Sequence, residues 1–105
     1  MAATYQLTIL TPAGSVFAGA AEALVVSGRE GSFGVLAHHA GIFAALVPGP
    51  TVVTAADGTK KFFATGAGVL EMTRNECRVL VDVAVPAADL AAAHAKVAEL
   101  HSPIA

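Results

Sequence analysis

Apolar and polar residues alternate over short stretches in the first three-quarters of the chain. Tyr5, Leu7 and Ile9 are separated by polar residues, which is the period-two pattern of a half-buried strand. The same alternation returns from Cys77 onward, where valines occupy every second position up to Val85. The pattern predicts strands over residues 5–9, 15–18, 21–27, 33–36, 42–47, 51–55, 59–65, 69–72 and 77–85.

Turn-forming residues separate these stretches. Asp57-Gly58 is the strongest hairpin signal, because both residues accept the positive φ angles of a tight turn. Pro12 and Gly14 mark a reversal after the first strand, and residues 73–76 mark another. Glycines at 66 and 68 predict a bulge or bend before the strand at residues 69–72.

The hydrophobic period changes after Pro86. Leu90, Val97 and Leu100, together with Ala93, fall on one face of a helix. Because a short helix is marginal alone in water, we expect it to dock on the strands through its leucines and Val97. The sequence therefore predicts a mostly β protein: a β-sandwich domain over residues 1–85, of about eight to ten strands, and a short C-terminal α-helix within residues 86–105, docked on the sandwich.

Charge is distributed unevenly along the chain. The 6 basic and 8 acidic residues give a net charge of −2, which does not favour nucleic-acid binding. Residues 1–56 carry only Glu22, Arg29 and Glu30, and residues 31–56 carry no charge. A charge-poor, apolar surface is typical of the centre of a protein interface, so this half of the chain is expected to face a partner.

The chain has no stretch of the roughly 18 apolar residues that spans a bilayer and no basic segment typical of a signal peptide. Its single cysteine, Cys77, excludes an internal disulfide. We therefore expect a cytoplasmic protein.

Candidate chemistry is sparse. His38 and His39 are adjacent and would point to opposite sides of a strand, while His94 and His101 are two helical turns apart. The glycines at 28, 31 and 34 fit neither a dinucleotide-binding nor a phosphate-binding loop. Cys77 is interpreted as a packing residue. No catalytic residues, metal site or cofactor are expected; the enzyme alternative is a jelly-roll protein that uses His38 and His39 with a metal.

A series of short motifs runs in order from Thr4 to Leu100. They comprise Leu10-Thr11-Pro12, Val16-Phe17-Ala18-Gly19, Gly28-Arg29-Glu30-Gly31-Ser32-Phe33-Gly34, His39-Ala40, Ala45-Leu46-Val47-Pro48-Gly49, Gly66-Ala67-Gly68-Val69-Leu70-Glu71-Met72 and Cys77-Arg78-Val79-Leu80-Val81-Asp82. Each motif is weak alone, but the ordered set resembles the ε subunit of F-type ATP synthases.

The sequence departs from the family pattern at several points. Ser32 replaces an acidic residue, and residues 37–41 differ from the usual Pro-Gly-His-Ala-Pro segment. Residues 88–93 lack the arginine that belongs to the nucleotide-binding pattern of some members. The sequence is similar to a short form without the second C-terminal helix, which implies weak or absent inhibition of ATP hydrolysis.

The resemblance implies a non-catalytic central-stalk rotor subunit that couples ion translocation to ATP synthesis. It would bind the γ subunit and the c-ring, with indirect contact to the α and β subunits. It would reach the membrane only through this peripheral complex, on the cytoplasmic face of the inner (plasma) membrane. By position, the γ contact would include His39, Ala40 and Ile42, and the c-ring contact would include Gly28, Arg29, Glu30, Gly31, Ser32, Phe33 and Gly34.

The alternative within the same fold is a free-standing β-sandwich module that binds another protein. The changes at Ser32 and residues 37–41 favour this alternative, because they lie in the segments that would contact the rotor.

Overall fold

The computed structural model describes residues 3–38 and 41–100. Within these residues the chain forms nine strands and one helix, which confirms the expected fold class of a β-sandwich followed by a C-terminal helix. The elements are β1 Tyr5–Thr11, β2 Gly14–Gly28, β3 Gly31–Leu36, β4 Ile42–Leu46, β5 Gly49–Ala55, β6 Lys60–Thr65, β7 Gly68–Thr73, β8 Glu76–Val81, β9 Ala84–Ala87 and α1 Leu90–Leu100.

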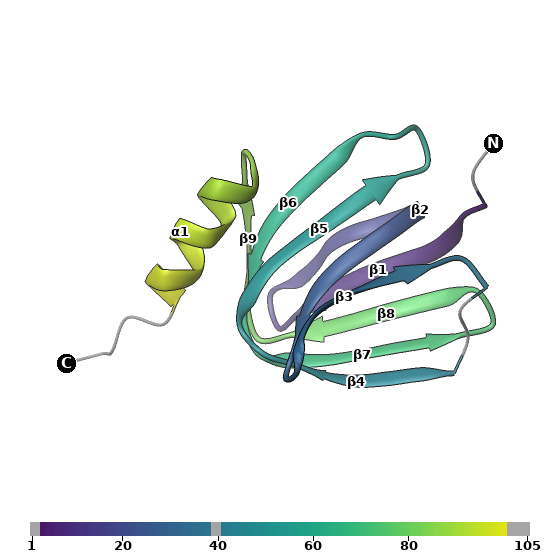
Figure 1. Ribbon diagram of the computed structural model, residues 1–105, viewed down its shortest axis with the longest axis horizontal. Coiled ribbons are helices and arrows are strands. Elements are labelled where there is room, and N and C mark those ends of the chain that lie inside the picture. The colour runs from purple at the N-terminus through teal and green to yellow at the C-terminus, as the bar shows by residue number, and fades with distance from the viewer. Residues whose placement is uncertain (1–2, 39–40, 101–105) are drawn as a thin grey trace.

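The hydrogen-bonded strands fold over into two layers, and β2 belongs to both (Figure 1). The first half of β2 pairs with β1, and that layer continues through β8 and β7 to β4. The second half of β2 pairs with β3 and β5, and the other layer continues through β6 to β9. On one side the layers end at β3 and β4, and β4 is joined to β2 only at the Gly28–Leu46 pair. On the other side they end at the first half of β2 and at β9.

Alternating side chains fill the space between the layers. Tyr5, Leu7 and Ile9 of β1 are buried, as the period-two pattern predicted. On β8, burial again falls on every second residue, at Cys77, Val79 and Val81. Both strands thus direct these alternate side chains to one shared core.

The strand expected at residues 15–18 and the one expected at 21–27 are a single strand, so the predicted break at Gly19 was wrong. The strand predicted over residues 77–85 was also wrong, because β8 ends at Val81 and β9 begins in the other layer at Ala84. Gly66 and Ala67 likewise connect β6 to β7 across the layers rather than bending one strand. Strand β9 runs to Ala87, beyond Pro86, and the division at residue 85 stays a prediction.

Helix α1 begins after Asp89, whose carboxylate accepts a hydrogen bond from the Ala92 N–H at 2.8 Å. This is an N-cap, which satisfies a backbone donor that the first turn leaves free. The helix contacts β5, β6 and β9, with Ala93 fully buried. Leu90, which was expected to dock on the sandwich, is only partly covered, with 45% of its surface exposed. In the part of the chain described, no helix has the length and hydropathy to cross a membrane.

Candidate functional site

The hairpin that joins β2 to β3 is a tight, exposed projection. Gly28 pairs with Gly31, so Arg29 and Glu30 alone form the turn, and both are exposed. Gly31 has a φ of 124°, which residues with a side chain rarely adopt. The expected polar loop over residues 28–32 is therefore a two-residue turn between paired strands.

The Phe33 ring packs between the backbone of this hairpin and the core. A Cβ on Gly28 would lie 2.8 Å from the Phe33 ring, so the absence of a side chain at position 28 lets the ring pack against the backbone. Phe33 is half-buried and also packs against the core cluster. The tip is thus held in place by an aromatic residue that shares contacts with the sandwich.

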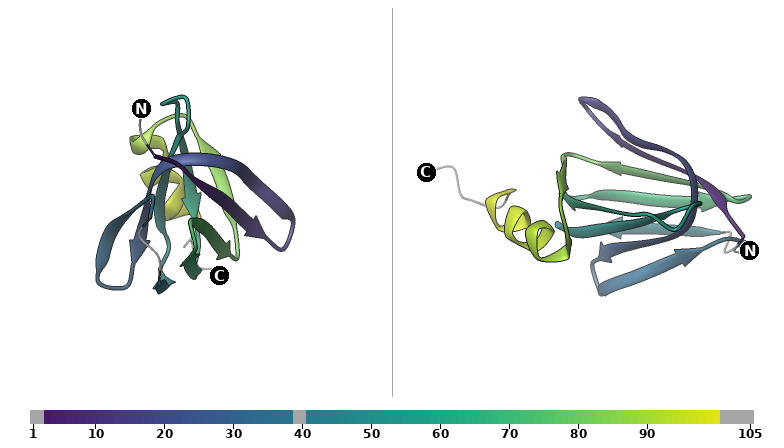
Figure 2. Two further views of the ribbon diagram at one scale, coloured as in Figure 1. Left: turned by 90° about the vertical axis from the view of Figure 1, so that its right-hand side faces the viewer. Right: turned by 90° about the horizontal axis from the view of Figure 1, so that it is seen from above.

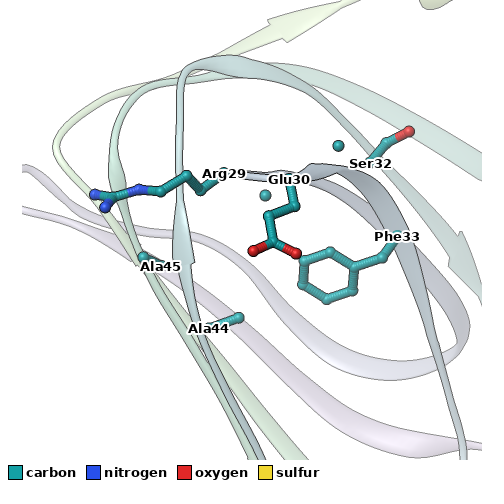
Figure 3. A pocket seen from close by; sticks show the side chains of 8 residues that line it. Arg29, Glu30, Ser32, Phe33, Ala44 and Ala45 are labelled. Carbon is teal, nitrogen blue, oxygen red and sulfur yellow. The ribbon is translucent and has the colours of Figure 1, made fainter.

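A cleft of about 400 Å³ lies between this hairpin and β4. Figure 3 shows Arg29 and Glu30 extending in different directions from the turn, with Glu30 on the side of Phe33. Ala44 and Ala45 of β4 complete the lining. The predicted c-ring residues Gly28 to Ser32 and Phe33 therefore come together around one cleft, whereas Gly34 does not line it.

The predicted γ contact is placed only in part. His39 and Ala40 lie outside the described residues. Ile42 is half-buried and packs against the core, so its side chain faces inward. The adjacent residue, Phe43, is 73% exposed, and Leu36 at the end of β3 is 61% exposed. Large exposed apolar side chains of this kind mark interaction surfaces when they are grouped.

Phe43 lies on the outer face of the layer formed by β1, β8, β7 and β4, and other apolar side chains lie beside it on this face. Strand register aligns Ala45, Val69, Leu80 and Leu10 in one cross-strand row, and Leu80 is 45% exposed. The neighbouring row contains Phe43 with charged residues, of which Arg78 pairs with Glu76 on its own strand at 3.8 Å. Sequence reasoning missed this apolar row, because it becomes visible only when the register of four strands is known.

Asn75 ties together the end of the sandwich at which β4 starts. Its side-chain oxygen accepts a hydrogen bond from the His38 N–H at 3.0 Å, and its amide group donates to the Thr4 carbonyl at 2.7 Å. Asn75 and His38 both have φ angles above 60°, which asparagine tolerates better than most residues. Asn75 therefore fixes the backbone that leads into the predicted γ contact.

Among the residues whose structure is described, reactive or metal-binding groups do not gather at these surfaces. Cys77 is fully buried, and burial raises the pKa of its thiol to about 12. In residues 3–38 and 41–100, no three His, Cys, Asp or Glu side chains are close enough together to hold a metal ion. The surface instead presents a cleft and exposed apolar and charged side chains on paired strands, which are features of a protein-binding surface.

Comparisons with known proteins agree on one family. Residues 4–87 match the family model described as ATP synthase, Delta/Epsilon chain, beta-sandwich domain. The chain is 36% identical over 83 residues to an ATP synthase epsilon chain of a Nitratiruptor species, a match that covers 79% of this chain. It is 38% identical over 88 residues to an ATP synthase epsilon chain of Rhodopseudomonas palustris, with 84% of this chain covered. The matches span 64% of the length of each of these curated relatives.

Two solved structures share the fold. A chain of the Euglena gracilis mitochondrial ATP synthase (OSCP/F1/c-ring) superposes with a TM-score of 0.76 at 24% identity, covering 82% of this chain and 55% of that one. A chain of the Tetrahymena thermophila mitochondrial ATP synthase (central stalk/c-ring) superposes with a TM-score of 0.64 at 18% identity. The match covers 79% of this chain and 66% of that one.

Proposed function

Because the chain belongs to the family of ATP synthase delta and epsilon chains, whose β-sandwich domain it contains, we propose that it is a non-catalytic rotor subunit of the central stalk. In this role it binds the γ subunit and the c-ring, and it transmits the rotation driven by ion flow to the α and β subunits, which make ATP. The observation that carries the proposal is the family match over residues 4–87, together with two exposed surfaces on a rigid sandwich.

The c-ring contact is the β2–β3 hairpin with its cleft, residues 28–34. Its two-residue turn presents Arg29 and Glu30 to solvent while Phe33 holds the turn against the sandwich. Charged residues at the rim of an interface set orientation and association rate more than affinity. Arg29 and Glu30 are therefore expected to fix the register of the hairpin on the ring.

The γ contact comprises His39, Ala40 and Ile42, extended by the exposed side chain of Phe43. Ile42 faces the core, so it supports the contact from beneath while Phe43 supplies the accessible apolar surface. Aromatic side chains in the centre of an interface commonly contribute most of the binding energy. We expect Phe43 and Leu36 to lie against γ, and the row that contains Leu80 to continue this surface.

A coupling part must also resist deformation. The strands of both layers share one core of close-packed apolar side chains, and densely packed interiors have low compressibility. The buried Tyr5 hydroxyl links the layers through a 2.7 Å hydrogen bond to the Val35 carbonyl. These features suit a block that holds two partners without slipping.

The proposal is tested by binding the purified chain to the cognate γ subunit. A stable complex is expected, and Phe43→Ser should weaken it by about tenfold or more, as expected for an interface anchor. Leu90→Ser is the matched control, because Leu90 is an exposed leucine on the helix, away from β4. A folded γ that does not bind the chain would instead favour a free-standing binding module.

The c-ring contact needs the assembled complex. Exchanging the charges in Arg29→Glu/Glu30→Arg should slow assembly of the chain with a γ–c-ring subcomplex, and the defect should shrink at high salt. Glu99→Arg on the last turn of α1 serves as a control of similar exposure. The same assembled complex allows the expected weak or absent inhibition of ATP hydrolysis to be measured. Assembly that is unaffected by the exchange would remove the hairpin from the contact.

A further inference from the structure

The sandwich has a second opening, on the side away from the β3–β4 edges. A groove of about 600 Å³ runs between the first half of β2 and the β6–β9 pair. Figure 2 (right) shows the β1–β2 hairpin standing away from the other strands. The groove is lined by residues 16–18 of β2, 60–63 of β6 and 86–88 at the end of β9. This opening shares no residue with the hairpin and the β4 surface described above.

A β-bulge gives the groove its apolar floor. Phe17 pairs with Ile9 and Ser15 pairs with Leu10, so Val16 is an extra residue without a partner on β1. As a result, both Val16 and Phe17 pack against the core cluster, where regular alternation would turn one of them outward. Phe63, which is 5% exposed, faces them from β6. Three large apolar side chains thus line one groove on the surface.

The strands beside the groove have free edges. Within the described residues, Gly14 to Gly19 of β2 pair only with β1, and β9 pairs only with β6. Unpaired backbone N–H and C=O groups at a strand edge can bond to an extended segment of another chain. The bulge at Val16 interrupts a long continuous ladder, so side chains in the groove must supply most of the selectivity.

The rim of the groove is positively charged. Lys60 and Lys61 are exposed, and they are the only two adjacent basic residues in the sequence. Lys60 donates a hydrogen bond to Thr54 Oγ1 at 3.3 Å, and no carboxylate lies within 4 Å of either lysine among the described residues. The nearby Asp57 is held mainly by hydrogen bonds from Thr59, which lower its pKa, with a smaller effect from Lys61. Lys60 and Lys61 can therefore pair with a carboxylate supplied by a bound ligand.

We propose that this groove binds an extended acidic segment of another polypeptide, with one large apolar side chain against Phe17 and Phe63 and a carboxylate beside Lys61. The apolar floor selects the anchor by burial, and the lysine pair selects the flanking charge. The chain as a whole has a net charge of −2, so a general attraction of acidic peptides to this protein is not expected. Attraction must come from the local pair.

The test is an NMR titration of the isotope-labelled chain at low ionic strength. The probe is a blocked peptide, Thr-Val-Phe-Val-Asp-Asp, and the control peptide ends in Lys-Lys. We expect saturable shifts of the amides of residues 15–18 and 60–63, with the acidic peptide binding about tenfold more tightly than the basic one. Lys60→Glu/Lys61→Glu should reverse this preference, while Arg74→Glu, a change at an exposed arginine elsewhere, should leave it intact.

Three results would overturn the proposal. They are an absence of saturable shifts, equal affinity for both peptides, and shifts confined to other surfaces. Sedimentation of the chain alone distinguishes a further occupant: dimers that form through residues 15–18 and 60–63 would show that a second copy fills the groove. The test uses no γ subunit, so its outcome is independent of the stalk assignment.

Discussion

At the scale of single residues, Gly28 sets the shape of the β2–β3 hairpin. A Cβ at this position would lie 2.8 Å from the Phe33 ring and 3.1 Å from the Gly31 carbonyl oxygen. Gly28→Ala should therefore destabilise the protein by about 1–3 kcal/mol, because either the ring or the turn must move. Chemical denaturation monitored by circular dichroism measures this loss.

Gly34→Ala is the matched control on the same hairpin. The nearest atom to a Cβ at Gly34 is the Leu24 carbonyl oxygen at 3.7 Å, an ordinary contact. Its free energy of unfolding should stay within about 0.5 kcal/mol of the wild type. Equal losses for the two variants would show that the Phe33 contact does not constrain position 28.

Cys77 shows how burial changes the chemistry of one side chain. Its thiol pKa is raised from 9.0 to about 12 by desolvation. Below pH 9 the thiol is protonated in both the folded and the unfolded state, so the stability that depends on the protonated thiol is fully present. Between pH 9 and 12 only the unfolded state loses the proton, so stability should fall as pH rises through this range.

Alkylation with iodoacetamide measures the same burial directly. The native protein should react far more slowly at pH 8 than the protein unfolded in urea, because the thiolate is the reacting species. Cys77→Ala should show a shallower loss of stability above pH 9. Rapid alkylation of the native protein would contradict a sealed core at this position.

At the scale of elements, α1 depends on its N-cap. The helix has eleven residues, too few to be stable alone, and Asp89 accepts a hydrogen bond from the Ala92 N–H. Asp89→Ala should cost about 1 kcal/mol and should lower the hydrogen-exchange protection of the helix more than that of the strands. Asp89→Ser, which can also cap, should retain most of the protection. Unchanged exchange in Asp89→Ala would mean that packing alone holds the first turn.

The strands show which element boundaries a sequence pattern can predict and which it cannot. Alternation located β1 and the start of β8 correctly, because each has one buried and one more exposed face. It could not detect the corner after Val81, since Asp82 and Val83 shift the chain into the other layer without a glycine or proline to mark the change. Ala84 packs against the core as a result, although a continuous strand would place it on the outer side.

The candidate binding surfaces also could be predicted from the sequence only in part. The charge-free run at residues 31–56 contains β3 and β4, which carry the exposed Leu36 and Phe43, and their role in an interface stays a prediction. It also contains β5, where the lack of charge reflects the burial of Thr51 and Val53. Residues 42–46 are all apolar, so only pairing with β7 decides that Ile42 faces inward and Phe43 outward.

At the scale of the whole molecule, a buried hydrogen bond joins the two layers in addition to the apolar packing between them. The Tyr5 hydroxyl donates to the Val35 carbonyl at 2.7 Å, which joins β1 in one layer to β3 in the other across thirty residues of sequence. Burial, with a smaller effect of Cys77, raises the pKa of Tyr5, so the hydroxyl keeps its proton and remains a donor.

Tyr5→Phe keeps the ring but removes this donor, and the buried Val35 carbonyl loses a partner. The free energy of unfolding should fall by about 1–2 kcal/mol, with one cooperative transition and an unchanged dependence on urea. Ser15→Ala is the control, because the Ser15 hydroxyl makes only a local, exposed bond to the Phe17 carbonyl at 3.2 Å. If Tyr5→Phe were as stable as Ser15→Ala, the layers would be held by apolar packing alone, and the Tyr5 hydroxyl would not contribute to the stiffness proposed for the stalk.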